Sequence, residues 1–393
     1  MRANAEFDVI VYGASGFTGR LVAEYLAQRH GVGGDLKWAM AGRSLEKLAA
    51  VRDEIGAPAA TPLVAADADD EASVTALVRR AKVILTTVGP YQLYGNKLVA
   101  ACAAEGTDYV DLCGEPTWMR QMIDAHAEAA KASGARIVFS CGFDSIPFDL
   151  GVLFLQEGAR ARFGAPCPRV KTRVRKMKGE SSGGTVASFK ATMAAAGRDP
   201  AVMALLRDPF ALTPGFQGPK QPSGGKPEID PDLDAWVAPF FMAPINTRNV
   251  HRTNALLGHA YGADFSYDEM IIAGKGERGE AVAKSIAGSQ GSLGGSRNPQ
   301  PGEGPSFEER EAGMYDLLFL GIVPDGRQIR ATVTGDKDPG YGSTCKMISE
   351  AALCLIDEAA ETPGGIWTPG AAMGDKLIAR LIAHAGLTFT LEG

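Results

Sequence analysis

One stretch near the start of the chain predicts the fold: Phe7-Asp8-Val9-Ile10-Val11-Tyr12 runs directly into Gly13-Ala14-Ser15-Gly16-Phe17-Thr18-Gly19. The first six residues are mostly apolar, which is typical of a buried strand. The glycine turn is followed by apolar residues at helical spacing and then by a second apolar run that ends in Ala41-Gly42-Arg43-Ser44. The order strand, glycine turn, helix and strand predicts a nucleotide-binding unit of the Rossmann type.

Each glycine of the turn has a physical reason to be there. Gly13 and Gly16 let the backbone turn sharply and approach a pyrophosphate, because neither carries a Cβ. Gly19 allows the helix to pack closely on the strand, and the helix start presents free N–H groups to phosphates. The spacing is G-x-x-G-x-x-G, a variant seen in many NADP-linked reductases. We therefore expect the whole turn to bind the cofactor: Gly13, Ala14, Ser15, Gly16, Phe17, Thr18 and Gly19.

The end of the second strand distinguishes the two nicotinamide cofactors. NAD enzymes usually carry an acidic residue at this place, which binds the ribose 2′-hydroxyl. This chain has Arg43 followed by Ser44 instead, and a guanidinium suits a 2′-phosphate. The cofactor predicted from this position is NADP(H). The alternative is that Arg43 is only a solvated loop residue.

Composition excludes several classes of partner. The 393 residues are 45% hydrophobic and 22% charged, with a formal net charge of −6, so nothing favours a nucleic-acid partner. Six cysteines lack paired spacing and five histidines lack metal-ligand spacing, which predicts buried thiols and no metal. We find no run long enough to span a membrane and no room for a signal peptide before the first strand. The expected location is the cytoplasm.

The alternation of strand and helix patterns predicts the domains. Six strands alternate with helices through about residue 155, which predicts an α/β fold with a doubly wound parallel sheet. We place an NADP-binding domain at 1–160 and a second α+β domain, with a mainly antiparallel sheet for substrate binding or oligomerisation, at 161–340. C-terminal helices in 341–393 are expected to pack back on the nucleotide domain.

Two stretches of the second domain suggest connections without regular structure. Residues 213–239 are rich in proline and glycine and predict an excursion over the surface. Residues 286–306 are rich in glycine, serine and proline and predict a mobile connection.

Ligands of a doubly wound sheet bind at the carboxyl ends of its strands, and polar loops follow these ends here. We expect cofactor contacts after the third, fourth and sixth strands, from Asp67, Thr87, Val88, Gly89, Pro90, Cys141 and Gly142. The candidate catalytic residues are Tyr91 and Asp144.

The motifs together resemble the saccharopine dehydrogenase-like oxidoreductases. The resemblance is carried in the first domain by the glycine turn, by Ala41-Gly-Arg-Ser44, by Thr87-Val-Gly-Pro-Tyr91 and by Cys141-Gly-Phe-Asp-Ser-Ile-Pro147. Later stretches resemble the branch called trans-acting enoyl reductases: Ser182-Gly-Gly-Thr-Val186, Ala243-Pro-Ile-Asn-Thr-Arg248, Arg252-Thr-Asn-Ala-Leu256, Gly340-Tyr-Gly-Ser-Thr344, Gly364-Gly-Ile-Trp-Thr-Pro369 and Ala372-Met-Gly374.

This resemblance implies an NADPH-dependent enzyme that reduces a carbon–carbon double bond in a polyketide or fatty acyl chain. The chain is carried by a separate synthase, on a carrier protein, and the product enters glycolipids. Relatives are described as membrane-associated, which would place this protein at the inner face of the plasma membrane. Residues 281–297 are short, polar and glycine-rich here, which argues against attachment. A homodimer is a further possibility.

The chemistry-bearing residues have structural alternatives. One role for Tyr91 is to donate a hydrogen bond or a proton to the substrate carbonyl, whose oxygen becomes enolate-like during reduction. The alternative is that the Tyr91 ring forms an apolar shelf for the nicotinamide. Tyr94 is a weaker candidate for the same role. Asp144 contacts the nicotinamide or substrate, or it caps a helix. For Ser145 we favour the capping role, with Pro147 in the first helical turn.

Other polar residues are more ambiguous. Cys113 and Cys141 are favoured as buried structural thiols, and Glu115 as a surface carboxylate. Arg248 and Arg252 bind a substrate carboxylate or a pantetheine phosphate, or form interdomain salt bridges. The basic strand face of Lys171, Arg173 and Arg175 is solvated, or docks an acidic carrier protein.

Three functions stay open at this point. The first is enoyl reduction of an acyl chain, which the apolar run 236–242 favours because an acyl pocket should be apolar. The second is reduction of an imine, as in saccharopine metabolism, which needs a pocket rich in charges. The third is a non-catalytic NADPH-binding scaffold on a lipid surface.

Overall fold

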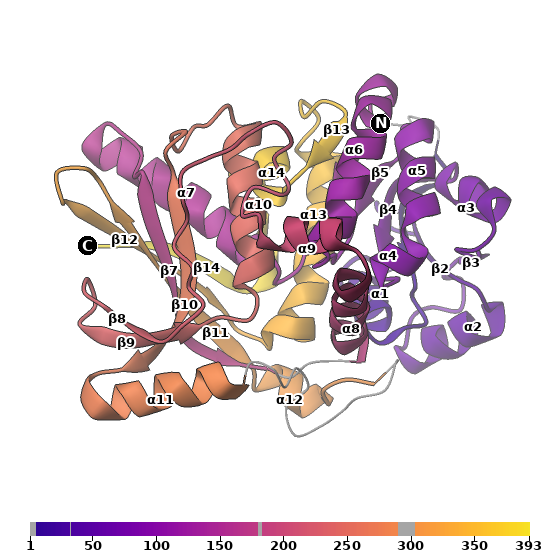
Figure 1. Cartoon of the computed structure of the whole chain (residues 1–393). Helices are drawn as coiled ribbons and strands as arrows, with labels where there is room; N and C mark the ends of the chain where they lie inside the picture. Colours follow the sequence, from indigo (N-terminus) through magenta and orange to yellow (C-terminus); the bar gives the residue numbers. More distant parts are fainter. Residues whose placement is uncertain (1–4, 32, 180–182, 290–302) are drawn as a thin grey trace.

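The computed structural model of the protein describes residues 5–31, 33–179, 183–289 and 303–393. Within this part of the chain, two seven-stranded sheets stand on either side of a central group of helices (Figure 1). The Gly/Ser/Pro-rich segment expected to be mobile lies partly outside the described residues, since 290–302 are among those omitted.

The first sheet is wholly parallel, with strands in the order β13-β6-β5-β4-β1-β2-β3. Its strands are β1 (Phe7–Tyr12), β2 (Trp38–Gly42), β3 (Leu63–Ala65), β4 (Ala81–Thr86), β5 (Asp108–Val110), β6 (Arg136–Val138) and β13 (Gly365–Trp367). The connecting helices are α1 (Phe17–His30), α2 (Leu45–Glu54), α3 (Glu71–Val78), α4 (Tyr91–Tyr94), α5 (Asn96–Glu105) and α6 (Pro116–Ser133). Helices cover both faces, which is why β1 and β4 are apolar on both sides.

The strand order reverses between β1 and β4. Chain order runs outward from β1 through β2 to β3, and then from β4 through β5 to β6 on the other side. The crevice at the carboxyl ends of β1 and β4 is the place where such sheets bind a dinucleotide. One mononucleotide half lies over β1 to β3 and the other over β4 to β6. The predicted doubly wound α/β fold is confirmed.

The second sheet is mixed and mainly antiparallel, with strands in the order β14-β12-β11-β7-β10-β9-β8. Its strands are β7 (Arg169–Lys178), β8 (Glu228–Asp230), β9 (Ala235–Pro239), β10 (Ser266–Gly274), β11 (Met314–Ile322), β12 (Gln328–Gly335) and β14 (Leu387–Glu392). Within this second sheet, only the β7–β10 pair is parallel among the described strands.

Helices from several parts of the chain fill the space between the sheets. These and the remaining helices are α7 (Ile146–Phe163), α8 (Gly183–Arg198), α9 (Pro200–Arg207), α10 (Ala243–Leu256), α11 (Gly276–Ser289), α12 (Phe307–Glu311), α13 (Thr344–Asp357), α14 (Pro369–Arg380) and the π-helical turns η1 (Pro339–Ser343) and η2 (Leu381–Ala385). α7 packs on α10, α14, β11 and β12. A Cβ at Gly151 of α7 would lie 2.2 Å from the Phe319 ring of β11, so only glycine permits this close packing.

Three sequence expectations need correction here. The nucleotide-domain sheet has β13 beside β6, because the C-terminal part of the chain returns to complete it. Residues 213–239 are not only a surface excursion, since β8 and β9 within them extend the second sheet. The C-terminal residues 387–392 form β14 of the second sheet rather than packing on the nucleotide domain. No described helix has both the length and the apolar composition required to cross a membrane.

A buried carboxylate connects three helices in the centre of the molecule. Glu350 of α13 is completely buried and accepts hydrogen bonds from the Tyr25 hydroxyl of α1 at 2.5 Å and from Arg380 Nε of α14 at 2.9 Å. Arg29 Nε of α1 lies 3.5 Å from the same carboxylate. A buried carboxylate requires such partners, because desolvation of an unpaired charge is costly.

We predict that Glu350→Ala lowers the free energy of unfolding by about 1–3 kcal/mol, because the half-buried Tyr25 hydroxyl and Arg380 Nε lose their hydrogen-bond acceptor. Urea unfolding measures this difference. The matched control is Glu54→Ala, which breaks the exposed Arg20–Glu54 pair and should cost no more than about 1 kcal/mol. Equal effects of the two substitutions would contradict the assignment.

Candidate functional site

The glycine turn is built by close backbone contacts. Gly13 has φ +93°, and a Cβ there would lie 2.8 Å from Val88 Cγ2 and 2.9 Å from Thr87 Oγ1. A Cβ at Gly19 would lie 2.1 Å from the Gly13 carbonyl oxygen. Both positions therefore require glycine, one for its backbone conformation and both for space.

The start of α1 fits an anionic ligand. Gly16 is the N-cap residue and has extended backbone, and no side chain caps the first-turn N–H groups. Ser15 and Gly16 are exposed, Thr18 is half-buried and Ala14 is buried beneath the turn. Uncapped N–H groups at an exposed helix start are suited to a pyrophosphate. The residues present thus fit the dinucleotide that the turn predicts.

Phe17 connects the turn to the second half of the chain. Its half-buried ring meets Tyr341 of η1 edge to face, with 5.2 Å between the ring centroids. The guanidinium of Arg310 lies 5.9 Å from the same ring. Phe17 is therefore held by residues that come from more than 290 positions away.

Charged residues gather at the ends of β2 and β3, next to Tyr12. Burial, with a contribution from the charge of Asp67, raises the pKa of Tyr12 to about 12, and Arg43 acts in the opposite direction, so both charges lie near this hydroxyl. Arg43 and Asp67 are exposed. Ser44 is the N-cap of α2, and its Oγ accepts a hydrogen bond from the Lys47 N–H at 3.2 Å. The structure thus brings Arg43, Ser44 and Asp67 to one edge, on the β1-to-β3 half.

The loop after β4 lies beside the glycine turn. The Thr87 N–H donates to the Tyr12 carbonyl at 3.0 Å, and Thr87 Oγ1 donates to the Gly13 carbonyl at 3.4 Å. Val88 and Pro90 are half-buried, and Gly89 is exposed. This loop therefore stands directly at the strand reversal, on the β4-to-β6 half.

Tyr91 and Glu115 are buried and joined by a hydrogen bond. The Glu115 carboxylate accepts hydrogen bonds from the N–H groups of Tyr91 and Gln92, both at 2.9 Å. Glu115 is 1% exposed, so the expected surface carboxylate is wrong. The Tyr91 hydroxyl accepts from the Leu112 N–H at 3.0 Å, and burial raises its pKa well above the usual value. The hydroxyl is thus engaged with the backbone of the loop after β5.

The cysteines at the strand ends are buried thiols, as the sequence favours. Burial, with a contribution from Asp111, raises the pKa of both Cys113 and Cys141 well above the usual value. Gly142 is also buried, and a Cβ there would lie 2.8 Å from Leu112 Cδ2. Neither Cys141 nor Gly142 presents a side chain at the surface of the crevice.

Asp144 and Ser145 follow β6. Ser145 is the N-cap residue of α7, but its side chain makes no capping bond, so the favoured capping role is wrong. Ser145 Oγ instead accepts a hydrogen bond from Asn249 Nδ2 of α10 at 2.8 Å. Asp144 is half-buried, and desolvation raises its pKa to about 7. The Asp144 Oδ2 atom lies 3.7 Å from where a Cβ of Gly114 would stand, in the loop after β5.

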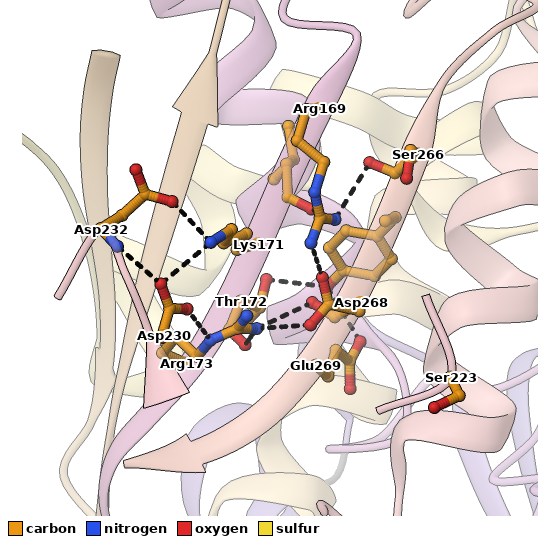
Figure 2. A network of polar contacts seen from close by, with 12 residues as sticks. Arg169, Lys171, Thr172, Arg173, Ser223, Asp230, Asp232, Ser266, Asp268 and Glu269 are labelled. Carbon is orange, nitrogen blue, oxygen red and sulfur yellow. Dashed lines mark hydrogen bonds and ion pairs between the residues drawn. The ribbon is translucent and has the colours of Figure 1, made fainter. Parts of the chain in front are cut away.

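The basic strand face of the second sheet is neither solvated nor free for docking. Lys171 Nζ lies 2.9 Å from Asp230 and 2.5 Å from Asp232, and Arg173 pairs with Asp230 and Asp268 at 2.8 Å each (Figure 2). Lys171 and Arg173 are buried in this network. Arg175 is half-buried and pairs with Glu392 and Asp316. For Lys171 and Arg173, the solvated face and the carrier-protein docking face predicted from the sequence are therefore both wrong.

The two arginines of α10 donate to backbone carbonyls. Arg248 donates to Pro244 and Leu206, and Arg252 donates to Leu212 and Ile366. Burial lowers the pKa of each guanidinium to about 10. The Arg252–Ile366 bond joins α10 to β13, so it connects the two halves of the molecule through a carbonyl rather than the expected salt bridge.

Sequence reasoning missed one acid in this region, Glu269 of β10. It is 1% exposed, and it accepts hydrogen bonds from Asn246 Nδ2 and from the Tyr267 hydroxyl, both at 2.9 Å. The signal was present in the strand itself. Asp268 and Glu269 are adjacent, and neighbouring residues of a strand point to opposite faces, so one acid must face the interior of a covered sheet.

We predict that Tyr91→Phe lowers the free energy of unfolding by about 1–3 kcal/mol, because the Leu112 N–H loses its acceptor. Denaturant unfolding tests this value. Tyr94→Phe is the matched control, since Tyr94 is 40% exposed, and it should change stability by less than about 0.5 kcal/mol. An unchanged stability in Tyr91→Phe would show that the hydroxyl is not held as described.

Comparison with known proteins agrees with this geometry. Residues 9–138 match the family model of the saccharopine dehydrogenase NADP binding domain. A Mycobacterium tuberculosis protein whose name proposes trans-acting enoyl reductase activity is 41% identical, covering 96% of each chain. The trans-acting enoyl reductases of Mycobacterium bovis and Mycobacterium ulcerans are 39% and 40% identical with the same coverage. A solved apo saccharopine dehydrogenase (L-Glu forming) of Saccharomyces cerevisiae has a TM-score of 0.56 at 13% identity, covering 98% of this chain and 100% of that chain, and shows the shared fold.

An NADP-binding domain and relatives of this similarity over nearly the whole chain establish an NADP-dependent oxidoreductase. The chain belongs to the saccharopine dehydrogenase-like oxidoreductases, in the family of the trans-acting enoyl reductases.

Proposed function

We propose that this enzyme uses NADPH to reduce the carbon–carbon double bond of an enoyl thioester in a polyketide or fatty acyl chain. The chain would be presented on a carrier protein of a separate synthase, and the product would serve glycolipid synthesis. The names of the mycobacterial relatives support an acyl substrate. The cytoplasm is the proposed location.

The observation that supports this proposal is that four basic side chains in the second half of the chain are already bound to acids or carbonyls of the protein. A saccharopine-type substrate is zwitterionic and needs cations to hold its carboxylates. Lys171 and Arg173 are neutralised by three buried or half-buried aspartates, and Arg248 and Arg252 are committed to carbonyls. The sequence offered Arg248 and Arg252 as anchors for a substrate carboxylate or a pantetheine phosphate, and all four of these basic side chains are used internally. An uncharged acyl thioester needs no such anchor.

We infer the cofactor site from the placement of the loops. The turn Gly13, Ala14, Ser15, Gly16, Phe17, Thr18 and Gly19 would hold the pyrophosphate, with Arg43 and Ser44 at the 2′-phosphate and Asp67 beside the adenosine half. Thr87, Val88, Gly89 and Pro90 would line the nicotinamide half, with Cys141 and Gly142 as buried support.

Bound NADPH supplies the hydride that the double bond receives at its β-carbon. The protein must then orient the acyl chain, exclude water and provide a proton for the α-carbon. Asp144 is the proposed proton donor, because it is half-buried at the nicotinamide half and its pKa is raised to about 7. Tyr91 would act by holding the loop after β5, since its hydroxyl is bonded to the Leu112 N–H.

We predict that NADPH binds at least tenfold more tightly than NADH, and that Arg43→Ala removes this preference by weakening NADPH alone. The expected loss is about 1.4 kcal/mol or more, the value of one tenfold step. Fluorescence titration with both cofactors measures it. Arg278→Ala, an exposed arginine of α11, is the matched control and should leave both affinities unchanged. A preference that survives Arg43→Ala would contradict the role of Arg43.

We predict turnover of trans-2-enoyl thioesters with NADPH, and none above background with a 2-oxo acid and an amino acid, the components of a saccharopine-type imine. Oxidation of NADPH followed by absorbance, with product analysis by mass spectrometry, distinguishes the two. Faster reduction of the imine would favour the saccharopine-type reaction. Tight NADPH binding without turnover of either substrate would favour the scaffold.

A further inference from the structure

Phe17, in the glycine turn, is in contact with a segment from the second half of the chain. Gly304 packs directly on the Phe17 ring, since a Cβ at Gly304 would lie 2.4 Å from Phe17 Cε1. Tyr341 of η1 meets the same ring edge to face. Phe17 is the first residue of α1, whose first-turn N–H groups have no side-chain cap. The segment therefore reaches the place at which the pyrophosphate of the cofactor is proposed to bind.

Two guanidinium groups lie beside the Phe17 ring. The Cζ atom of Arg20, on α1, is 5.6 Å from the ring centroid, and the Cζ atom of Arg310, on α12, is 5.9 Å from it. Both distances are within the range of a cation–π contact. The first turn of α1 contains no acidic residue. Positive charge therefore gathers at the start of a helix, where the helix dipole already favours an anion.

The two arginines differ in how their charge is compensated. Arg20 Nη1 lies 2.6 Å from the Glu54 carboxylate. Arg310 is half-buried and forms no ion pair within the described part of the chain, where its guanidinium donates one hydrogen bond, from Nη1 to the Pro305 carbonyl at 2.8 Å. A guanidinium has five N–H donors, so Arg310 keeps donors and an uncompensated charge for a ligand.

The acids whose carboxyls interact with the charge of Arg310 do not bind its guanidinium. These acids include Asp338 and Glu308. Asp338 is completely buried, and its two oxygens accept hydrogen bonds from the N–H groups of Tyr341 at 3.0 Å and Gly342 at 2.6 Å. Glu308 is exposed, where solvent and salt screen its charge. Neither acid therefore replaces an anionic ligand.

The backbone around Arg310 holds it at this position. A capping box fixes the start of α12. The Arg310 carbonyl accepts a hydrogen bond from the Asp338 N–H at 3.0 Å, which joins α12 to η1. Thr344, which follows η1, accepts at Oγ1 from the Phe143 N–H of the loop after β6 at 2.9 Å. The same part of the chain thus contacts the glycine turn and the loop after β6, which both stand at the carboxyl edge of the first sheet.

We propose that Arg310 is a cofactor-binding residue, whose guanidinium binds the pyrophosphate of NADPH from the second half of the chain. This inference rests on the proposed placement of the pyrophosphate at the glycine turn, and it does not depend on the acyl substrate. The N–H groups of α1 and the guanidinium together compensate the negative charge of the phosphates. NADPH and NADH have the same pyrophosphate, so Arg310 strengthens the binding of both cofactors. Arg43 acts differently, because only NADPH carries the 2′-phosphate.

Fluorescence titration of the full chain with NADPH and with NADH tests this assignment. Arg310→Met retains the apolar stem beside Phe17 and removes the charge, so it should raise the Kd of both cofactors by about tenfold and by the same factor. The matched control is Arg327→Met, which removes an exposed arginine from the Phe163 ring and should leave both affinities unchanged. Unchanged affinities in Arg310→Met would overturn the proposal. A loss confined to NADPH would also overturn it, because it would place Arg310 at the 2′-phosphate.

Two further measurements separate the charge of Arg310 from its packing. Arg310→Lys restores a positive charge, so its affinities for both cofactors should lie between those of the wild type and Arg310→Met. Added salt should reduce the difference in Kd between the wild type and Arg310→Met, because salt screens the contact in the wild type. A difference that does not depend on salt, or an Arg310→Lys variant that binds no better than Arg310→Met, would mean that Arg310 only supports the turn, and would overturn the proposal.

These titrations distinguish the role of Arg310 from the proposed function. They need no acyl substrate, so they decide the role of Arg310 even if the wild type reduces no enoyl thioester. Arg43→Ala tests the cofactor placement separately, through the preference for NADPH over NADH.

Discussion

The approach of Gly19 to the carbonyl of Gly13 is the contact on which the rest of the site depends. A Cβ at Gly19 would lie 2.1 Å from that oxygen, so the first turn of α1 can rest on the end of β1 only if this residue is glycine. The contact directs the uncapped start of α1 toward the carboxyl edge of the sheet. The loops after β2, β3, β4, β5 and β6 reach the same edge because all the strands are parallel.

Buried acids have different partners on the two faces of the second sheet. On one face of the second sheet, acids and bases neutralise one another, and these groups stabilise the packing of β7, β8 and β10. On the other face, Glu269 accepts hydrogen bonds from the Asn246 amide and the Tyr267 hydroxyl instead. Desolvation raises the pKa of this carboxyl, so the two faces of the sheet accommodate buried acids in different ways.

Much of the nucleotide-binding half could be predicted from local sequence. The strand Phe7–Tyr12, the glycine turn and the helix that follows are adjacent in the chain, so their order alone indicates the fold. Roles that depend on distant partners were less predictable. Glu115 has the sequence context of a surface acid, but it is buried by binding the N–H groups of Tyr91 and Gln92. Alternation in 170–175 predicted a wet face, which the aspartates at 230, 232 and 268 instead cover.

The sequence by itself determined the strand, turn and helix of the cofactor unit, and with them the NADP-dependent class, because these signals depend on residues a few positions apart. Only the tertiary structure decided which distant segments meet at the junction of the two sheets. Ser145 and Glu269 are separated by more than 120 positions, and α10 connects their segments, because Asn249 donates to Ser145 and Asn246 donates to Glu269. Desolvation and like-charge proximity arise from such packing, and no local pattern encodes them.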